Sequence, residues 1–380
     1  MEKRLYVVAG ELSGDLHGAG LLTELGKMVP GLKVRGVGGA AMKRATIGET
    51  EDWLEDAAVM GFWEVLKRYP WFRERFFRML AELKEFRPEV LLLIDYPGFN
   101  LRFAEAVKRE CPETKIVYYI SPQVWAWKKG RIPKMARLID ELMCLFPFEQ
   151  PLLAQAGLKT TFSGHPLVDE LEESRIPDVR RESALVGLFP GSREHEVERL
   201  FPLMIRTAVF LREWRADLKF EVPAASEKLA ARIRAMLAEA EAETLVKVTD
   251  GQSHALMQRA TCAVVASGTA TLEAAWYGLP YCLVYRVAPL TYALAKILVK
   301  IKWIGLVNIL AGREVVREFV QGAAQPEAVA TELRGLLESA AKREALQSDL
   351  ADTVAKLGGP GAHRRAAEIT ARWLGADAAD

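Results

Sequence analysis

The sequence predicts an α/β protein with two doubly wound, parallel-sheet domains that face each other across a cleft. Three observations support this fold class. The chain has 380 residues, which is too long for one ordinary core and suits two domains. Short apolar runs alternate with helical patterns throughout, as is typical of βαβ units and parallel sheets covered on both faces. Residues 166–180 are polar, bounded by prolines and without strong periodicity, so we expect the interdomain linker there.

The expected elements follow in order along the chain. Helical patterns at 73–86 and 103–110 lie between strands in the first half. The C-terminal segment 362–374 is also helical, but its packing partner stays open. We therefore predict domains at 1–168 and 169–360, followed by a C-terminal helix within 361–380. The expected strands are 5–9, 33–37, 90–94, 115–120 and 141–145 in the first half, and 184–188, 219–222, 246–248, 262–265 and 281–285 in the second.

Composition limits the classes of function. Half of the residues are hydrophobic and the formal net charge is +1, so no nucleic-acid partner is indicated. The four cysteines lack a CxxC spacing and the five histidines lack an HxH or HExxH pattern, so we expect reduced thiols and no metal site. The first apolar run is too short for a signal peptide, and no apolar run is long enough to span a bilayer. These features predict a cytoplasmic protein, with attachment to a membrane surface left open.

Two motifs in the second half predict a nucleotide site. Residues 189–194 (Phe-Pro-Gly-Ser-Arg-Glu) and 267–273 (Ser-Gly-Thr-Ala-Thr-Leu-Glu) each follow an apolar run and open onto a helical pattern. Small residues let the backbone approach a ligand, and a helix N-terminus favours an anion. Arg193 adds a planar charged fork for phosphate oxygens, and Glu273 could accept hydrogen bonds from a ribose diol. Two ordinary capped loops are the alternative, but their pairing in one half favours a nucleotide.

Asp95 is the best candidate for acid–base chemistry. It ends the apolar run 90–94 and precedes Tyr-Pro-Gly-Phe-Asn. A carboxylate at the carboxyl end of a buried strand points to where ligands bind such sheets, and partial desolvation raises its proton affinity. An aspartate that starts a Pro-Gly turn is the alternative.

Two glycine-rich segments precede Asp95. The loop at 10–18 is not a GxGxxG motif, but Ser13, Asp15 and His17 could bind hydroxyls or a phosphate of a second substrate; a capped helix N-terminus is the alternative. Residues 36–41 match GxGxxA but follow the second strand, so they only weakly indicate NAD.

Three further segments could contact a sugar or a lipid. Residues 121–131 combine two tryptophans with three cations, which suits stacking on a sugar or binding an anionic lipid; core packing of the indoles is the alternative. Residues 59–78 and 290–306 mix apolar and aromatic residues with cations. Such segments lie in the membrane interface, although amphipathic helices that cover a sheet share this pattern. Together they favour peripheral attachment or an acylated substrate.

The chain resembles the lipid-A-disaccharide synthases, which are glycosyltransferases of Gram-negative envelope biogenesis that act at the cytoplasmic face. The string Ser121-Pro122-Gln123-Val124-Trp125-Ala126-Trp127 is highly specific. The resemblance runs in order along nearly the whole chain, through residues 10–15, 58–61, 94–100, 121–127, 146–149, 164–166, 189–193, 267–273 and 308–314.

The resemblance implies an inverting enzyme of the two-Rossmann (GT-B) type. It would join UDP-2,3-diacylglucosamine to 2,3-diacylglucosamine 1-phosphate, giving a β-1,6-linked tetraacyl disaccharide 1-phosphate and UDP. Asp95 would take the proton of the acceptor 6-hydroxyl. Arg193 with Ser192 would balance the departing diphosphate, without a cofactor or metal. The enzyme would sit peripherally on the inner membrane, with a homodimer left open.

Two positions depart from the usual sequence of the family. Leu12 replaces an alanine, and Leu306-Val307 replaces a Leu-Pro pair, which puts the geometry of Asn308 in question. The second candidate function is a UDP-N-acetylglucosamine 2-epimerase-like enzyme of the same fold, and a non-catalytic nucleotide-binding scaffold comes third.

The resemblance also implies the remaining site residues. These are Gly191, Ser192, Arg193, Ser267, Gly268, Thr269, Thr271, Glu273, Arg286 and Asn308 for the donor, Ser13, Gly14, Asp15 and Trp125 for the acceptor, and Met60, Phe62, Trp63, Leu66, Trp71 and Phe72 for acyl chains or membrane.

Overall fold

The computed structural model describes residues 2–46, 49–54, 69–127, 129–298 and 301–376. The chain forms two compact units, Met1–Pro166 with Leu357–Asp380, and Leu167–Lys356. The predicted boundary at 168/169 lies two residues from the observed one, and 357–360 belong to the first unit, not the second. The predicted linker at 166–180 is partly wrong, because α9 (Leu167–Glu173) forms within it and belongs to the second unit.

The described part of the first unit contains a parallel sheet with the strand order β3-β2-β1-β4-β5-β6-β7. Every strand predicted in this half is present within one or two residues of its expected bounds. The strands β3 and β7 were not predicted from the sequence; they have three residues each and lie at the two edges of the sheet. The strands are β1 (Arg4–Ala9), β2 (Lys33–Gly38), β3 (Thr50–Asp52), β4 (Val90–Ile94), β5 (Lys115–Tyr119), β6 (Glu141–Cys144) and β7 (Thr160–Phe162).

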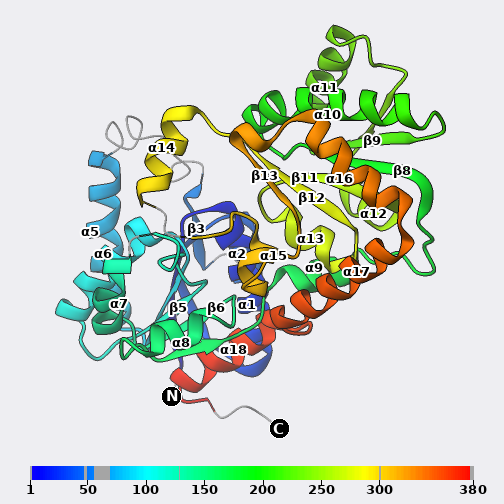
Figure 1. The fold of residues 1–380 in the computed structure, drawn as a ribbon. Coiled ribbons are helices and arrows are strands. Elements are labelled where there is room, and N and C mark those ends of the chain that lie inside the picture. Colours follow the sequence, from blue (N-terminus) through cyan, green and yellow to red (C-terminus); the bar gives the residue numbers. More distant parts are fainter. Residues whose placement is uncertain (1, 47–48, 55–68, 128, 299–300, 377–380) are drawn as a thin grey trace. The chain divides into compact units, whose positions relative to one another are not determined.

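Helices cover both faces of this sheet (Figure 1). Leu5 and Val7 of β1 point to one apolar cluster, whereas Tyr6 and Val8 point to the other, as the two-residue period of a strand requires. The sequence left the packing partner of the C-terminal helix undecided. In the structure this helix, α18, packs on α1 and therefore belongs to the first unit. The first cluster is covered by α1 (Leu12–Met28), α2 (Ala40–Ala45) and α18 (Ala362–Trp373), and the second by α5 (Tyr69–Phe86), α6 (Pro97–Glu110), α7 (Ile132–Leu138) and α8 (Glu149–Ala154).

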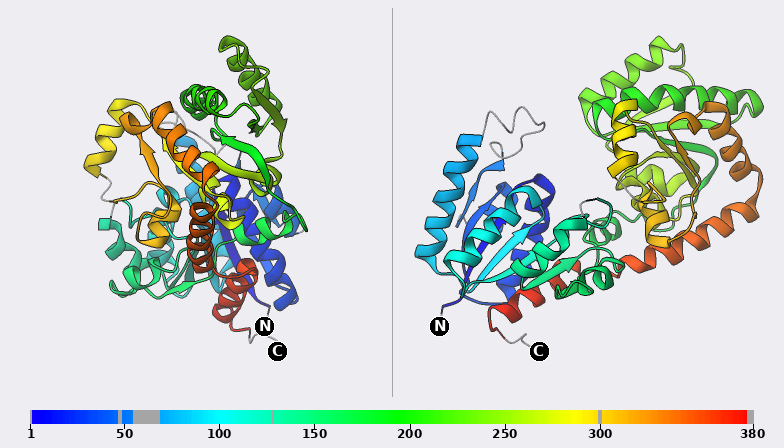
Figure 2. Two further views of the ribbon diagram at one scale, coloured as in Figure 1. Left: turned by 45° about the vertical axis from the view of Figure 1, so that its right-hand side comes forward. Right: turned by 60° about the vertical axis from the view of Figure 1, so that its left-hand side comes forward.

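The second unit repeats this architecture of a parallel sheet covered by helices (Figure 2). Its strand order is β10-β9-β8-β11-β12-β13. Its main apolar cluster lies between the sheet and α10, α11 and α16, while α12 and α13 contact β8 and β11 from the other face. The strands are β8 (Glu182–Phe189), β9 (Lys219–Ala224), β10 (Val246–Asp250), β11 (Ala260–Ala266), β12 (Tyr281–Tyr285) and β13 (Glu318–Val320). The helices are α10 (Glu194–Trp214), α11 (Glu227–Glu239), α12 (Ser253–Arg259), α13 (Ala270–Trp276), α14 (Pro289–Leu298), α15 (Leu306–Ala311), α16 (Pro326–Glu338) and α17 (Ala340–Val354).

Each sheet has one point where the strand order changes direction. In the first unit it lies between β1 and β4, and in the second between β8 and β11. Ligands of doubly wound sheets bind at the carboxyl ends of the strands at this switch point. The loop after Ala9 and Asp95 follow β1 and β4, and the motifs at 190–193 and 267–273 follow β8 and β11. The topology therefore places the predicted motifs of each unit at its expected ligand edge.

Candidate active site

Asp95 occupies a strained turn directly after β4. Asp95 and Tyr96 have φ angles of +43° and +47°, and Ile120, directly after the neighbouring β5, has +68°. Left-handed conformations are uncommon outside glycine and cluster at functional sites. The side-chain amide of Asn100 donates to the Asp95 carbonyl oxygen at 2.8 Å, and the Tyr118 hydroxyl donates to the same oxygen. The backbone of Asp95 is thus held from both sides.

The carboxyl group of Asp95 has an elevated proton affinity. Burial and, to a smaller extent, the negative charge of Glu11 raise its pKa to about 6, against an opposing hydrogen bond from the Tyr96 backbone. Gly10 allows this arrangement, since a Cβ at this position would overlap the Tyr96 ring. A carboxylate with this pKa is half ionised near pH 6, which suits a general base at neutral pH.

A cavity of about 250 Å³ opens beside Asp95. Its walls come from the loops that follow β5 and β6. Trp127 is the exposed indole of the 121–127 string, with 44% of its surface accessible. The lining residues are Asp95, Ile120, Ser121, Gln123, Trp127, Leu145, Phe146 and Glu149.

Trp125 does not offer a ligand surface in this structure. Its side chain is 8% exposed, and its indole N–H donates to the Glu149 carboxylate at 3.1 Å. Its ring also meets the Phe148 ring edge-on, with centroids 5.2 Å apart. Trp125 therefore packs in the core, and Trp127 is the indole that lines the cavity. The acceptor role of Trp125 stays a prediction.

Ser13, Gly14 and Asp15, which were predicted in a loop after β1, lie in the first turn of α1. Ser13 is exposed, whereas Gly14 is buried against Ala9 and Ile94. Asp15 is 2% exposed, and its carboxylate accepts hydrogen bonds from the backbone N–H groups of three residues of the 39–42 segment, where α2 begins. Gly14 and Asp15 are therefore structural, because their side-chain positions face the protein interior.

The GxGxxA match at 36–41 serves this capping interaction. A Cβ on Gly36, whose φ is +135°, would overlap the Val7 carbonyl oxygen. A Cβ on Gly39 would come within 2.6 Å of the Asp15 carboxylate. These glycines permit close internal contacts, so nothing in their geometry points to a dinucleotide.

In the second unit, Arg193 stands at the N-cap of α10. Its guanidinium forms an ion pair with Glu196 at 3.0 Å, and 62% of its side chain is exposed. Ser192 is exposed beside it. Gly191 has φ +112°, and a Cβ there would overlap the Glu196 carboxylate. The turn after β8 thus presents Ser192 and Arg193 to solvent, with Glu196 as a partner that the sequence analysis did not identify.

The turn after β11 leaves only some of its predicted donor-binding residues exposed to solvent. Gly268 has φ +150° and open space at its Cβ position, and Thr269 is exposed. Ser267 is half-buried, and its N–H donates to the Val284 carbonyl oxygen. Thr271 is fully buried, and its hydroxyl donates to the Gly268 carbonyl oxygen at 2.7 Å. Its contact with the donor stays a prediction.

Glu273 is paired with a histidine that the sequence analysis missed. The imidazole Nε2 of His254, on α12, lies 3.3 Å from Oε2 of Glu273. This hydrogen bond raises the pKa of His254, with burial opposing it. Sequence spacing gave no signal for the pair, because the two residues lie on different helices.

Asn308, whose donor role stays a prediction, is hydrogen-bonded within the second unit. It is 1% exposed, and its amide nitrogen donates to the Val316 carbonyl oxygen and to Glu318, while its amide oxygen accepts from the N–H groups of Val315 and Val316. All of its hydrogen-bonding capacity is therefore used inside the unit. Arg286, half-buried, donates to the Ala324 carbonyl oxygen.

The acyl or membrane residues are only partly described. Met60, Phe62, Trp63 and Leu66 lie outside the described residues. Trp71 stacks on Trp53 at 5.9 Å and Phe72 contacts Phe99 at 6.5 Å, so both rings pack on the core of the first unit. Phe77 of α5 is instead the exposed aromatic side chain, at 56%, with the Arg73 guanidinium 5.9 Å from its ring centroid.

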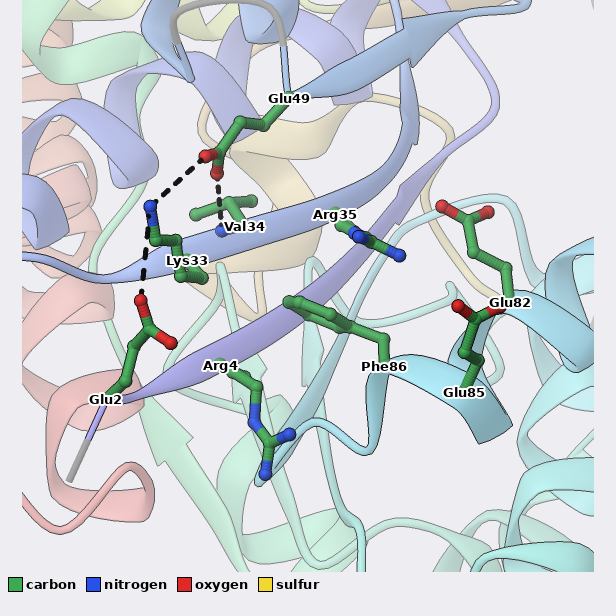
Figure 3. Close-up of a pocket in the computed structure, with 9 residues that line it drawn as sticks. All are labelled: Glu2, Arg4, Lys33, Val34, Arg35, Glu49, Glu82, Glu85 and Phe86. Carbon is green, nitrogen blue, oxygen red and sulfur yellow. Dashed lines mark hydrogen bonds and ion pairs between the residues drawn. The ribbon is translucent and has the colours of Figure 1, made fainter.

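Another hollow, of about 570 Å³, lies at the opposite end of the first sheet (Figure 3). Arg4 and Lys33 begin β1 and β2 there, so it opens at the amino ends of the strands. Lys33 lies 4.0 Å from both Glu2 and Glu49, and the Arg35 guanidinium lies 4.9 Å from the centre of the Phe86 ring. Its charges serve surface ion pairs, and its position is far from the switch point.

Two half-buried histidines make the first unit sensitive to acid. Desolvation lowers the pKa values of His17 and His165 to about 4, together with the charges of His363 and His17, respectively. Unfolded histidine titrates near 6.5. The neutral rings therefore contribute stability above pH 6.5 that is lost as the pH falls toward 4.

We expect the melting temperature of the protein to fall as the pH is lowered from 6.5 to 4. His165→Gln should make this dependence shallower, and thermal unfolding at several pH values measures it. His195→Gln, at an exposed position of α10, is the control. An unchanged slope for His165→Gln would contradict the assignment.

The topology and the two ligand edges define a protein of the two-Rossmann GT-B architecture, to which glycosyltransferases and UDP-sugar epimerases belong. A crystal structure of UDP-GlcNAc 2-epimerase from Neisseria meningitidis has a TM-score of 0.58 at 13% identity, covering 98% of this chain and 100% of that one. A glycosyltransferase from Rickettsia africae also gives 0.58 at 11% identity, with 98% of each chain covered. These likenesses concern the fold.

The sequence comparisons identify the family. The family described as lipid-A-disaccharide synthetase matches residues 5–372. A lipid-A-disaccharide synthase of Trichlorobacter lovleyi is 41% identical over 97% of this chain and 96% of its own length. That of Geobacter sulfurreducens is 39% identical over 98% and 97%. The chain belongs to the lipid-A-disaccharide synthase family and is a glycosyltransferase of lipid A disaccharide formation.

Proposed function

We propose that this enzyme transfers 2,3-diacylglucosamine from UDP to the 6-hydroxyl of 2,3-diacylglucosamine 1-phosphate. The acceptor O6 forms a bond to C1 of the donor sugar from the face opposite UDP. The C1–O bond to the diphosphate breaks, and UDP leaves with the bonding electrons. The product is the β-1,6-linked disaccharide 1-phosphate. The single observation that carries this proposal is Asp95, a half-buried carboxyl group with a raised pKa at the switch point of the first unit.

Asp95 is the proposed general base. The proton of the acceptor 6-hydroxyl passes to its carboxylate as O6 attacks. The hydrogen bonds from Asn100 and Tyr118 to its backbone carbonyl support this role, because they hold the turn that aims the side chain. The cavity beside Asp95 is smaller than the roughly 300–1,000 Å³ of sites for drug-sized ligands, so it suits one sugar ring, with the acyl chains outside it.

The second unit is the proposed donor unit. The exposed guanidinium of Arg193 and the hydroxyl of Ser192 would bind the diphosphate, together with the turn around Gly268 and Thr269. Glu273 would bind the ribose with the carboxylate oxygen that does not face His254. The proposed contacts of Ser267 and Arg286 rest on their positions after β11 and β12.

Peripheral binding to the inner membrane is part of the proposal. No helix among the described residues is long and apolar enough to cross a bilayer. The exposed Phe77, flanked by Arg73 and Arg78 on α5, offers a basic aromatic surface of the kind that enters the headgroup region. Sedimentation with anionic vesicles at low salt tests this, and absence of binding would contradict it.

The experiment that tests the function is UDP release from UDP-2,3-diacylglucosamine in detergent micelles, with and without the acceptor and with and without EDTA. Acceptor-dependent release together with a disaccharide product is expected. UDP-N-acetylglucosamine alone is the control substrate, and its turnover without acceptor would favour the epimerase-like alternative.

Trp127 gives a prediction within this assay. Trp127→Ala should raise the KM for the acceptor about tenfold, because stacking of a sugar on an indole is lost. Donor KM should stay near the wild-type value. Equal effects on both substrates, or no effect, would contradict a place for Trp127 at the acceptor sugar.

A further inference from the structure

Glu149 is a buried carboxyl group beside the reaction centre that the mechanism above does not use. Its side chain is 1% exposed, yet it reaches the wall of the cavity that Asp95 also lines. Burial raises its pKa to about 7, and hydrogen bonds from Phe146, Ser121 and Trp125 oppose the shift. Burying a carboxyl group is costly unless its oxygens are hydrogen-bonded, so its partners show what it does.

The two oxygens of Glu149 join the two loops that form the cavity wall. Oε1 accepts the indole N–H of Trp125 at 3.1 Å, on the loop after β5. Oε2 accepts the backbone N–H of Phe146 at 3.1 Å, on the loop after β6. The first loop also carries Gln123 and Trp127, which line the cavity. Glu149 therefore ties the sugar-facing loop to the end of β6.

We propose that Glu149 is a positioning residue for the acceptor: its carboxylate fixes the 121–127 loop through Trp125, so that Gln123 and Trp127 meet the acceptor sugar beside Asp95. This inference rests on the proposed function and deepens its acceptor site. Trp125 and Phe146 donate N–H groups to Glu149 and Ser121 donates its hydroxyl, and only a carboxylate offers an acceptor oxygen to each N–H group without a donor of its own. The network therefore requires a carboxylate at this position.

Glu149→Gln should raise the KM for 2,3-diacylglucosamine 1-phosphate about tenfold, with the donor KM and UDP affinity near wild type. Glutamine keeps the shape but turns one NH₂ group toward an N–H donor, and losing one hydrogen bond to a charged group corresponds to a tenfold effect or more. Trp125→Phe keeps an aromatic ring but removes the indole N–H, so it breaks the same hydrogen bond and should raise the acceptor KM to a similar extent. In the double variant Trp125→Phe/Glu149→Gln the two effects should not add, because that bond is already lost.

Glu141 provides a matched control in the same unit. It is also 1% exposed and accepts the indole N–H of Trp373 at 2.7 Å, but it starts β6 and so lies at the opposite end of that strand. Glu141→Gln should lower the melting temperature and leave the acceptor KM unchanged. This comparison separates loss of a buried indole–carboxylate pair from loss of loop position.

Non-additive effects of the two substitutions, confined to the acceptor, would support the proposal. A Glu149→Gln variant with wild-type acceptor KM would overturn it. An effect that is equal for both substrates, or that adds to that of Trp125→Phe, would also overturn it, since that is the result for a structural role alone. Turnover of the wild-type enzyme in the same assay tests the proposed function separately, because the inference depends only on ratios between variants.

Discussion

Replacing Asp95 with asparagine is expected to lower the turnover number by about two to four orders of magnitude, with UDP binding retained. The amide cannot take the proton of the acceptor hydroxyl. Asparagine tolerates the left-handed conformation of this residue, and the contacts of its backbone carbonyl with Asn100 and Tyr118 do not depend on the side chain. Initial rates of UDP release and titration with UDP measure the two parts of this prediction.

Stability provides an internal control for Asp95→Asn. The folded-state pKa of Asp95 is raised above its unfolded value, so its ionised form destabilises the folded protein above about pH 6. The variant should therefore melt at the same temperature as wild type or higher at pH 7.5. Unchanged turnover in a folded variant would remove Asp95 from the role of base.

The pH dependence of kcat/KM should depend on Glu11, because the charge of Glu11 affects the pKa of Asp95. Because the base must be ionised, kcat/KM should fall as the pH is lowered through about 6. Glu11→Gln removes the negative charge that raises the pKa of Asp95, so this limb should move to lower pH while the plateau rate changes little. A limb that does not move would show that Glu11 has no electrostatic effect on the titrating group.

Replacing Arg193 with alanine is the second large effect that we expect. UDP affinity should fall about ten- to hundredfold, because a charge-assisted hydrogen bond to the diphosphate is lost, and turnover should fall as well, since the same charge stabilises the leaving group. Folding should change little, because the Arg193–Glu196 pair is exposed. Calorimetric titration with UDP and steady-state kinetics measure both quantities.

Arg193→Lys tests the geometry of this contact. Lysine keeps the charge but lacks the planar fork, so UDP affinity should lie between those of wild type and the alanine variant. Normal affinity and normal turnover for Arg193→Ala would exclude this residue from the site.

Much of the fold could be predicted from local patterns. The buried strands β1, β4 and β12 are continuous apolar runs, and their bounds match the prediction to within a residue. The three-residue edge strands β3, β7 and β13 were missed, because so short a run has no measurable periodicity. The packing of α18 on α1 was also beyond reach, since an amphipathic helix fits either of two similar sheets.

The candidate site, like the fold, could be predicted only in part from the sequence. The sequence by itself determined the family, the alternation of strands and helices, and the motifs that follow β1, β4, β8 and β11, because these depend on order along the chain. Only the tertiary structure decided which polar side chains remain for a ligand. Asp15, Thr271 and Asn308 satisfy N–H groups or carbonyl oxygens of neighbouring segments, whereas Glu149 and His254 acquire their roles from residues on other elements. The physical reason is that a buried polar group must find a hydrogen-bond partner, and that partner is set by packing, which sequence spacing does not record.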